Sequence, residues 1–151
     1  VDIKEENINI PDSRTQDCEA ECVRYEEKYR AAGCADLALL GIGNNGHIGF
    51  NEPGTSFDSV THVTHIAEST IKANSRFFAS EDLVPKAAMT MGISTILSAK
   101  KIFILITGKA KHDILMKLIS SNEADESIPA TALRLHKDVT IYADREAAGL
   151  I

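Results

Sequence analysis

The sequence has few cysteines, no long apolar run and too few basic residues to balance its acids. Its 151 residues include 16 Lys and Arg against 22 Asp and Glu, a formal net charge of -6, which disfavours a general nucleic-acid-binding surface. No apolar run approaches the ~20 residues of a membrane-spanning helix, so we expect no membrane partner. The three cysteines, Cys18, Cys22 and Cys34, are an odd and sparse set. Such a set favours a reducing, cytoplasmic compartment over a disulfide scaffold.

What remains is the composition of an ordinary folded domain. Hydrophobic residues make up 44% and charged residues 25% of the chain, and this balance excludes disorder and low-complexity fibres. One domain over residues 1–151 is the simplest organisation. The chain begins at Val1 and its first methionine is Met89, so we expect it to be a piece of a longer protein.

Apolar runs alternate with helical patterns along the chain. The runs are predicted to be strands buried on both faces, at residues 37–42, 102–106 and 139–142. Helices are predicted at residues 14–32, 85–99 and 110–120. This alternation predicts an α/β fold with a Rossmann-like, mainly parallel sheet flanked by helices. Ligands of such sheets bind beyond the carboxyl ends of the strands, so a site is expected in the loops after Ile42 and Ile106.

The first predicted helix carries its own start and stop signals. Ser13 and Gln16 predict a capping box, and Gly33 predicts the end of the helix. Cys18 and Cys22 lie one turn apart on one face, with no His or acid arranged to complete a metal site. We interpret the two cysteines as packing residues.

The loop after Ile42 resembles a nucleotide-binding loop only superficially. Residues 41–46 match the pattern G-x-G-x-x-G. A dinucleotide-binding loop of that kind opens directly into a helix, whereas Gly49 and Pro53 interrupt any helix here within two turns. The sequence therefore argues against a dinucleotide cofactor, and it implies no metal or other cofactor.

Three polar side chains of this loop suit proton transfer. Asn45, His47 and Glu52 follow the predicted strand within eight residues. An imidazole titrates near neutral pH, a nearby carboxylate raises its basicity, and an amide can orient it. We therefore predict that these three residues are catalytic.

Five segments in order resemble those of the glucosamine/galactosamine-6-phosphate isomerase family, and they cover essentially the whole chain. They are Gly43–Pro53, Asn74–Phe78, Val84–Ile93, Thr107–Lys111 and Pro129–His136. The related 6-phosphogluconolactonases share the Gly-x-x-Gly-His turn but follow it with a different segment, one that lacks Phe-Asn-Glu-Pro. The resemblance is therefore to the glucosamine-6-phosphate deaminase branch.

The resemblance implies an enzyme that converts glucosamine 6-phosphate and water to fructose 6-phosphate and ammonia. His47 would handle the ring-oxygen proton as the pyranose opens, while Glu52 and Asn45 hold and tune the imidazole. Many relatives carry Asp at the position of Asn45, and an amide supplies no charge, so we expect a less basic His47 here. Arg76 and Lys111 match the family's phosphate-binding positions, which implies a small sugar phosphate as the binding partner.

Other interpretations stay open at this point. A galactosamine-6-phosphate deaminase/isomerase differs at one sugar hydroxyl, and a non-catalytic sugar-phosphate sensor or a truncated, inactive paralogue shares the same motifs. The family also has an earlier segment with the Asp that acts as base at C2. That pattern is absent from residues 1–151, and Asp36 and Asp144 lie in the wrong contexts to replace it. We therefore expect an incomplete sheet and little turnover by this chain alone, and assembly into a homo-oligomer stays open.

Overall fold

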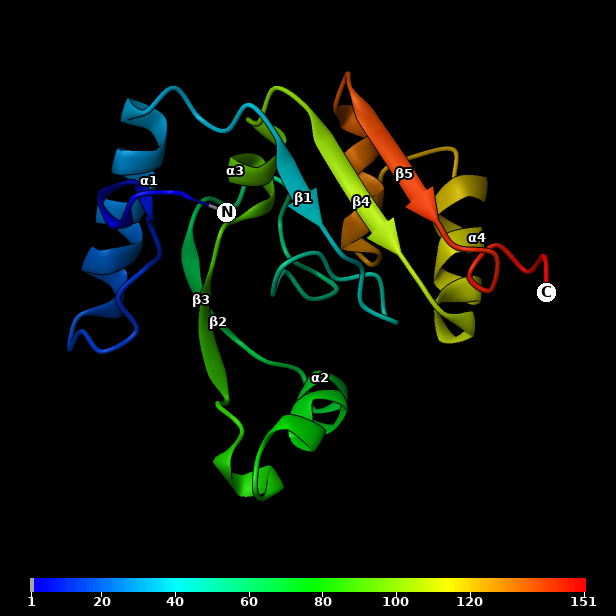
Figure 1. The fold of residues 1–151 in the computed structure, drawn as a ribbon, viewed down its shortest axis with the longest axis horizontal. Coiled ribbons are helices and arrows are strands. Elements are labelled where there is room, and N and C mark those ends of the chain that lie inside the picture. The colour runs from blue at the N-terminus through cyan, green and yellow to red at the C-terminus, as the bar shows by residue number, and fades with distance from the viewer. Residues whose placement is uncertain (1) are drawn as a thin grey trace.

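Three parallel strands form the centre of the fold. The structure, a computed structural model, describes residues 2–151 except for the side chains of Ser69, Ala73, Asn74 and Glu81. Val1, the first residue of the predicted domain, lies outside the described residues. Strands β1 (Ala38–Leu40), β4 (Ile102–Ile106) and β5 (Val139–Ala143) pair in the order β1-β4-β5, with both pairings parallel (Figure 1). The α/β class with a mainly parallel sheet is confirmed.

One face of this sheet packs on helices. Ile102, Ile104 and Ile106 are buried, because successive side chains of a strand point to opposite faces. They share an apolar core with residues of α4 (His112–Ser120) and of the 3-10 helix η5 (Pro129–Leu135) (Figure 1). The helix predicted at residues 110–120 is therefore confirmed as α4 and the turn before it.

The opposite face of the sheet is exposed, which corrects the prediction of strands buried on both faces. Leu39 is 63% exposed, Leu105 45% and Tyr142 48%. They lie on the face opposite the core, because the buried residues of β4 alternate with Phe103 and Leu105, which pair with Leu39 and Tyr142 respectively. Within residues 2–151, these apolar side chains face solvent instead of a second layer of helices.

The helix predicted at residues 85–99 is wrong over its first half and confirmed only for residues 93–97. β3 (Ala87–Thr90) pairs antiparallel with β2 (His62–His65), and only a short helix, α3 (Ile93–Leu97), follows after Gly92. Strand propensity depends on the neighbouring strand, and a strand partner this distant in the sequence leaves no trace in a local helical pattern.

The connection between β2 and β3 carries further short helices. They are α2 (Glu68–Asn74), η2 (Ser75–Phe77) and η3 (Glu81–Leu83). Figure 1 shows the β2–β3 hairpin leading away from the parallel sheet to α2. The hairpin therefore places a second group of residues beyond the carboxyl edge of the sheet.

The first helix, α1 (Cys18–Ala31), begins later than predicted. The side chain of Asp17 caps it by accepting a hydrogen bond from a backbone N–H of the first turn (3.0 Å). The predicted capping box of Ser13 and Gln16 is therefore wrong. The predicted stop is confirmed, because Gly33 has φ of 84°, a conformation that suits glycine at a helix end.

Glu26 joins α1 to the hairpin and to α3. Its Oε2 accepts hydrogen bonds from the backbone N–H of Thr61 (3.1 Å) and from the hydroxyls of Thr61 (2.6 Å) and Thr95 (2.7 Å). Its Oε1 pairs with Arg30 (2.7 Å). Burial raises the pKa of Glu26, but these hydrogen bonds and Arg30 outweigh burial and leave the pKa below its usual value. The fold therefore favours the charged form of this buried carboxyl.

Glu26→Gln is expected to lower the free energy of unfolding by about 1–3 kcal/mol at neutral pH, because it weakens the acceptor of three buried donors. The folded pKa is lowered, so the stabilisation by Glu26 is complete above the unfolded carboxyl pKa and is lost as pH falls through the folded pKa. Denaturant unfolding of both proteins along a pH series measures this. Glu27→Gln changes an exposed neighbour and is the control. Equal losses in the two variants would contradict the assignment.

Candidate functional site

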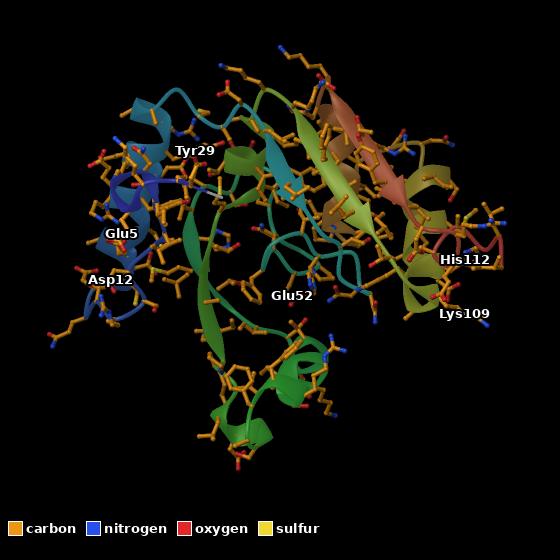
Figure 2. The ribbon with its side chains drawn as sticks, in the orientation of Figure 1. Glu5, Asp12, Tyr29, Glu52, Lys109 and His112 are labelled. Carbon is orange, nitrogen blue, oxygen red and sulfur yellow. The ribbon has the colours of Figure 1, made fainter. Side chains whose placement is uncertain are left out.

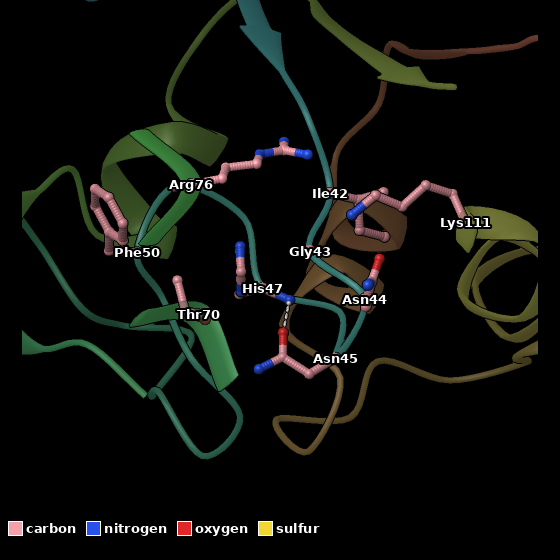
Figure 3. A pocket seen from close by; sticks show the side chains of 10 residues that line it. Ile42, Gly43, Asn44, Asn45, His47, Phe50, Thr70, Arg76 and Lys111 are labelled. Carbon is pink, nitrogen blue, oxygen red and sulfur yellow. Dashed lines mark hydrogen bonds between the residues drawn. The ribbon is translucent and has the colours of Figure 1, made fainter. Parts of the chain in front are cut away.

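A cavity of about 570 Å³ opens at the carboxyl edge of the sheet, where a site was expected. It lies between the loop after β1, the start of α4 and the α2–η2 segment (Figure 3). Its lining residues are Ile42, Gly43, Asn44, Asn45, His47, Gly49, Phe50, Thr70, Arg76 and Lys111. The structure thus brings four of the five predicted site residues to one cavity, and the fifth, Glu52, contacts two residues of its lining.

The glycine-rich loop after β1 turns back on itself. The N–H of Gly43 donates to the carbonyl of His47 (2.8 Å), and the N–H of Gly46 donates to the carbonyl of Gly43 (3.0 Å). A Cβ at position 43 would overlap the His47 imidazole, so glycine leaves room for that ring. Ile48 and Asn51 then form an antiparallel bridge. The prediction that no helix follows this loop is confirmed.

Glu52 is the acceptor around which the polar side chains are arranged, on the loop between the sheet and α2 (Figure 2). Asn45 Nδ2 donates to Glu52 Oε2 (2.6 Å), and Thr70 Oγ1 donates to Glu52 Oε1 (2.8 Å). Asn45 Oδ1 accepts a hydrogen bond from the backbone N–H of His47 (3.2 Å; Figure 3). His47 Nδ1 lies 3.5 Å from Glu52 Oε2, beyond the usual hydrogen-bond length. The Glu52 carboxylate therefore lies close enough to favour a proton on the imidazole, without a short hydrogen bond between the two side chains.

The surroundings of His47 favour its neutral form. Burial lowers the pKa of the imidazole, the Glu52 carboxylate opposes this effect, and the positive charge of Lys111 adds to it, with a net downward shift. The side chain of His47 is still 20% exposed, and the ring lines the cavity. A neutral imidazole that reaches a cavity can accept a proton from a bound molecule.

Arg76 and Lys111 enter the cavity from opposite sides (Figure 3). Arg76 belongs to η2, and its guanidinium lies 4.7 Å from the centre of the Phe77 ring. Lys111 ends the 3-10 turn η4 (Lys109–Lys111) and directly precedes α4, as the sequence indicated. Burial lowers the pKa of Lys111. A planar guanidinium and an ammonium that face one space suit an anion with several oxygens.

Sequence reasoning missed Thr70. This buried residue of α2 lines the cavity and binds the carboxylate of Glu52. The two residues are 18 positions apart, and a threonine in a short helix has no local pattern that would have indicated the contact. Its role appears only once the hairpin has placed α2 beside the loop.

Other candidate residues are engaged elsewhere. His112 and His136 bond to backbone carbonyls (2.9 and 2.7 Å), and Lys109 lies exposed near the start of α4 (Figure 2). Asp36 pairs with a surface lysine (2.6 Å), and Asp144 accepts a backbone N–H (2.9 Å). Among the described residues, no three His, Cys, Asp or Glu side chains gather as a metal ion would require, and no helix has the length and apolarity to span a membrane.

Comparison with known proteins relates the whole chain to one family. The family described as glucosamine-6-phosphate isomerases/6-phosphogluconolactonase matches residues 1–142. Glucosamine-6-phosphate deaminase 1 of Bacillus subtilis (strain 168) is 55% identical over 150 residues, which cover 99% of this chain and 62% of that protein. The glucosamine-6-phosphate deaminase of Thermoanaerobacter sp. (strain X514) is 50% identical over 151 residues, 100% of this chain and 59% of that protein. The chain therefore spans about three-fifths of the length of these relatives.

Solved structures show the same relationship. A structure described as a monomeric glucosamine-6-phosphate deaminase matches with a TM-score of 0.95 and 55% identity, over 98% of this chain and 61% of that chain. A 6-phosphogluconolactonase from Trypanosoma cruzi matches with a TM-score of 0.65 and 23% identity, over 87% of this chain and 51% of that chain. The second likeness concerns the fold alone.

Asn45→Asp is expected to raise the pKa of His47, because it replaces the amide that donates to Glu52 with a second carboxyl group and so adds acidic charge to the group beside the imidazole. NMR titration of the His47 ring in the parent and the variant measures the shift. Asn44→Asp adds the same charge at an exposed position of the same loop and is the matched control. If the pKa of His47 does not rise in Asn45→Asp, or rises equally in the control, the specific role of Asn45 is wrong.

Proposed function

This chain belongs to the family of glucosamine-6-phosphate isomerases and 6-phosphogluconolactonases, and we propose that the protein is a glucosamine-6-phosphate deaminase. The proposed reaction is a hydrolytic deamination in amino-sugar catabolism, in which glucosamine 6-phosphate and water give fructose 6-phosphate and ammonia. One observation carries the proposal: a proton-transfer group, His47, shares a cavity with two cations, Arg76 and Lys111.

The two cations support binding of the phosphate end of the substrate. The guanidinium of Arg76 presents a planar fork that matches phosphate oxygens. Lys111 stands at the N-terminus of α4, where its charge adds to the field of the helix end. Burial already disfavours the charged form of Lys111, and a bound anion would offset that cost.

The loop residues support opening of the pyranose ring. Ring opening moves a proton from the anomeric hydroxyl to the ring oxygen, so one group must accept a proton and return one. His47 suits this task because its surroundings favour the neutral imidazole, which accepts a proton before it donates one. Asn45 and Glu52 hold each other by a short hydrogen bond (2.6 Å) and keep the carboxylate beside the ring.

The proposal assigns phosphate binding and ring opening to residues of this chain, and no more. The later proton shift from C2 to C1 needs a base, and the lining of the described cavity contains no carboxylate side chain. The activity is therefore proposed for the whole protein. A cytoplasmic location belongs to the same proposal and is supported by the three free cysteines, Cys18, Cys22 and Cys34.

The experiment that tests this function supplies glucosamine 6-phosphate to the protein expressed over its entire source reading frame. We expect ammonia and fructose 6-phosphate in equal amounts, and His47→Gln should slow the pyranose form far more than the open-chain form. Galactosamine 6-phosphate is assayed in parallel, and faster ammonia release from that epimer would move the assignment to the galactosamine branch. Binding of the sugar phosphates without ammonia release would overturn the proposal in favour of a sensor or an inactive paralogue.

Lys111→Ala is expected to raise KM for the sugar phosphate about 10–100-fold, because a hydrogen bond to a charged group contributes about 1.5–3 kcal/mol. Steady-state kinetics of the same full-length protein measure KM. Lys109→Ala removes a neighbouring exposed lysine outside the cavity and should leave KM within about twofold. An unchanged KM in Lys111→Ala removes Lys111 from the phosphate site.

A further inference from the structure

We propose that Thr70 is a positioning residue that fixes the Glu52 carboxylate and joins the proton-transfer loop to the segment that carries Arg76. The proposal rests on the proposed function for the reaction that Thr70 serves. The contacts that carry it come from the structure alone.

Thr70 is buried, so its hydroxyl requires a hydrogen-bond partner within the protein. The residue is 7% exposed and lines the cavity next to His47 (Figure 3). Its Oγ1 donates to Glu52 Oε1 at 2.8 Å. A hydroxyl that donates to a carboxylate makes a stronger hydrogen bond than two neutral groups do. The contact therefore satisfies a buried donor and restrains an acidic side chain at once.

Thr70 supplies the second of two restraints on the carboxylate. The backbone carbonyl of Glu52 is held by Thr55, whose hydroxyl (2.7 Å) and N–H (3.0 Å) donate to it. Asn45 then holds Oε2, and Thr70 holds Oε1. One hydrogen bond alone leaves the carboxylate free to rotate about it, whereas two bonds on different oxygens fix its plane. With both in place, Oε2 stays 3.5 Å from His47 Nδ1.

The same residue connects this carboxylate to the phosphate end of the cavity. α2 (Glu68–Asn74) continues directly into η2 (Ser75–Phe77), which contains Arg76. The side chain of Ser75 bonds back to the carbonyl of Lys72 (2.7 Å) and ties the two helices together. An anion held by Arg76 therefore restrains the run of residues that positions Glu52. Binding energy at the phosphate end can in this way support the geometry needed for proton transfer.

The test compares Thr70→Val, which keeps the shape and removes the hydroxyl, with Thr70→Ser, which keeps the hydroxyl. In the full-length protein, we expect Thr70→Val to lower kcat for ammonia release about tenfold with KM within about twofold, a loss that corresponds to one hydrogen bond to a charged group. Thr70→Ser should recover kcat to within about threefold of the parent. Thr64→Val changes a β2 threonine outside the cavity and is the control.

NMR titration of His47 supplies a second readout that does not need deaminase activity. A carboxylate that is no longer fixed attracts the imidazole proton less, so the pKa of His47 should be lower in Thr70→Val than in the parent and in Thr70→Ser. If the parent releases no ammonia, the proposed function fails while this titration still tests Thr70. An unchanged or higher pKa of His47, or an unchanged kcat, overturns the proposal. Thr70→Ala takes the place of Thr70→Val if the latter does not fold.

Discussion

The Glu52 carboxylate connects the parts of the structure that the site requires. Its two oxygens accept hydrogen bonds from Asn45 on the loop and from Thr70 on α2, and its charge opposes the effect of burial on the pKa of His47. Removal of this carboxylate would leave the donors of Asn45 and Thr70 without their acceptor. The loss of stability would exceed that of one hydrogen bond on the surface, because unsatisfied buried donors carry a desolvation penalty. The carboxylate therefore stabilises the loop through its hydrogen bonds and raises the pKa of His47 through its charge.

The residues around that carboxylate come from two parts of the fold, the parallel sheet and the antiparallel β2–β3 pair. The parallel pairing of β1 with β4 places the carboxyl ends of both strands at one edge, so the loop with His47 and the turn with Lys111 face the same cavity. Thr70 and Arg76 come from the helical connection between β2 and β3. These two strands form an antiparallel pair outside the parallel sheet. The position of His47 and Lys111 thus follows from the edge of the parallel sheet, whereas the position of Thr70 and Arg76 depends on how the β2–β3 pair places α2.

This division explains how much was predictable from the sequence. The strands that became β1, β4 and β5 are short continuous apolar runs, and the loop after Ile42 combines glycines with polar groups, so local patterns were sufficient. The segment at residues 85–99 misled, because its strand pairs with the distant residues His62–His65. The role of Thr70 depends on a tertiary contact with Glu52. The exposure of the sheet face around Leu39 depends on the absence of a covering layer among the described residues. A local pattern of apolar residues indicates neither.

The charges around His47 act on its pKa in opposite senses. Burial lowers the pKa of the imidazole, Glu52 raises it and Lys111 lowers it further. Lys111 directly precedes α4, whereas Glu52 lies on the loop between β1 and β2. In the proposed complex, a phosphate between Arg76 and Lys111 would cancel much of the positive field that acts on the ring, while the Glu52 carboxylate would remain. The loss of that positive field would by itself raise the proton affinity of His47 in the complex, at the stage where the proposed mechanism has the imidazole accept a proton.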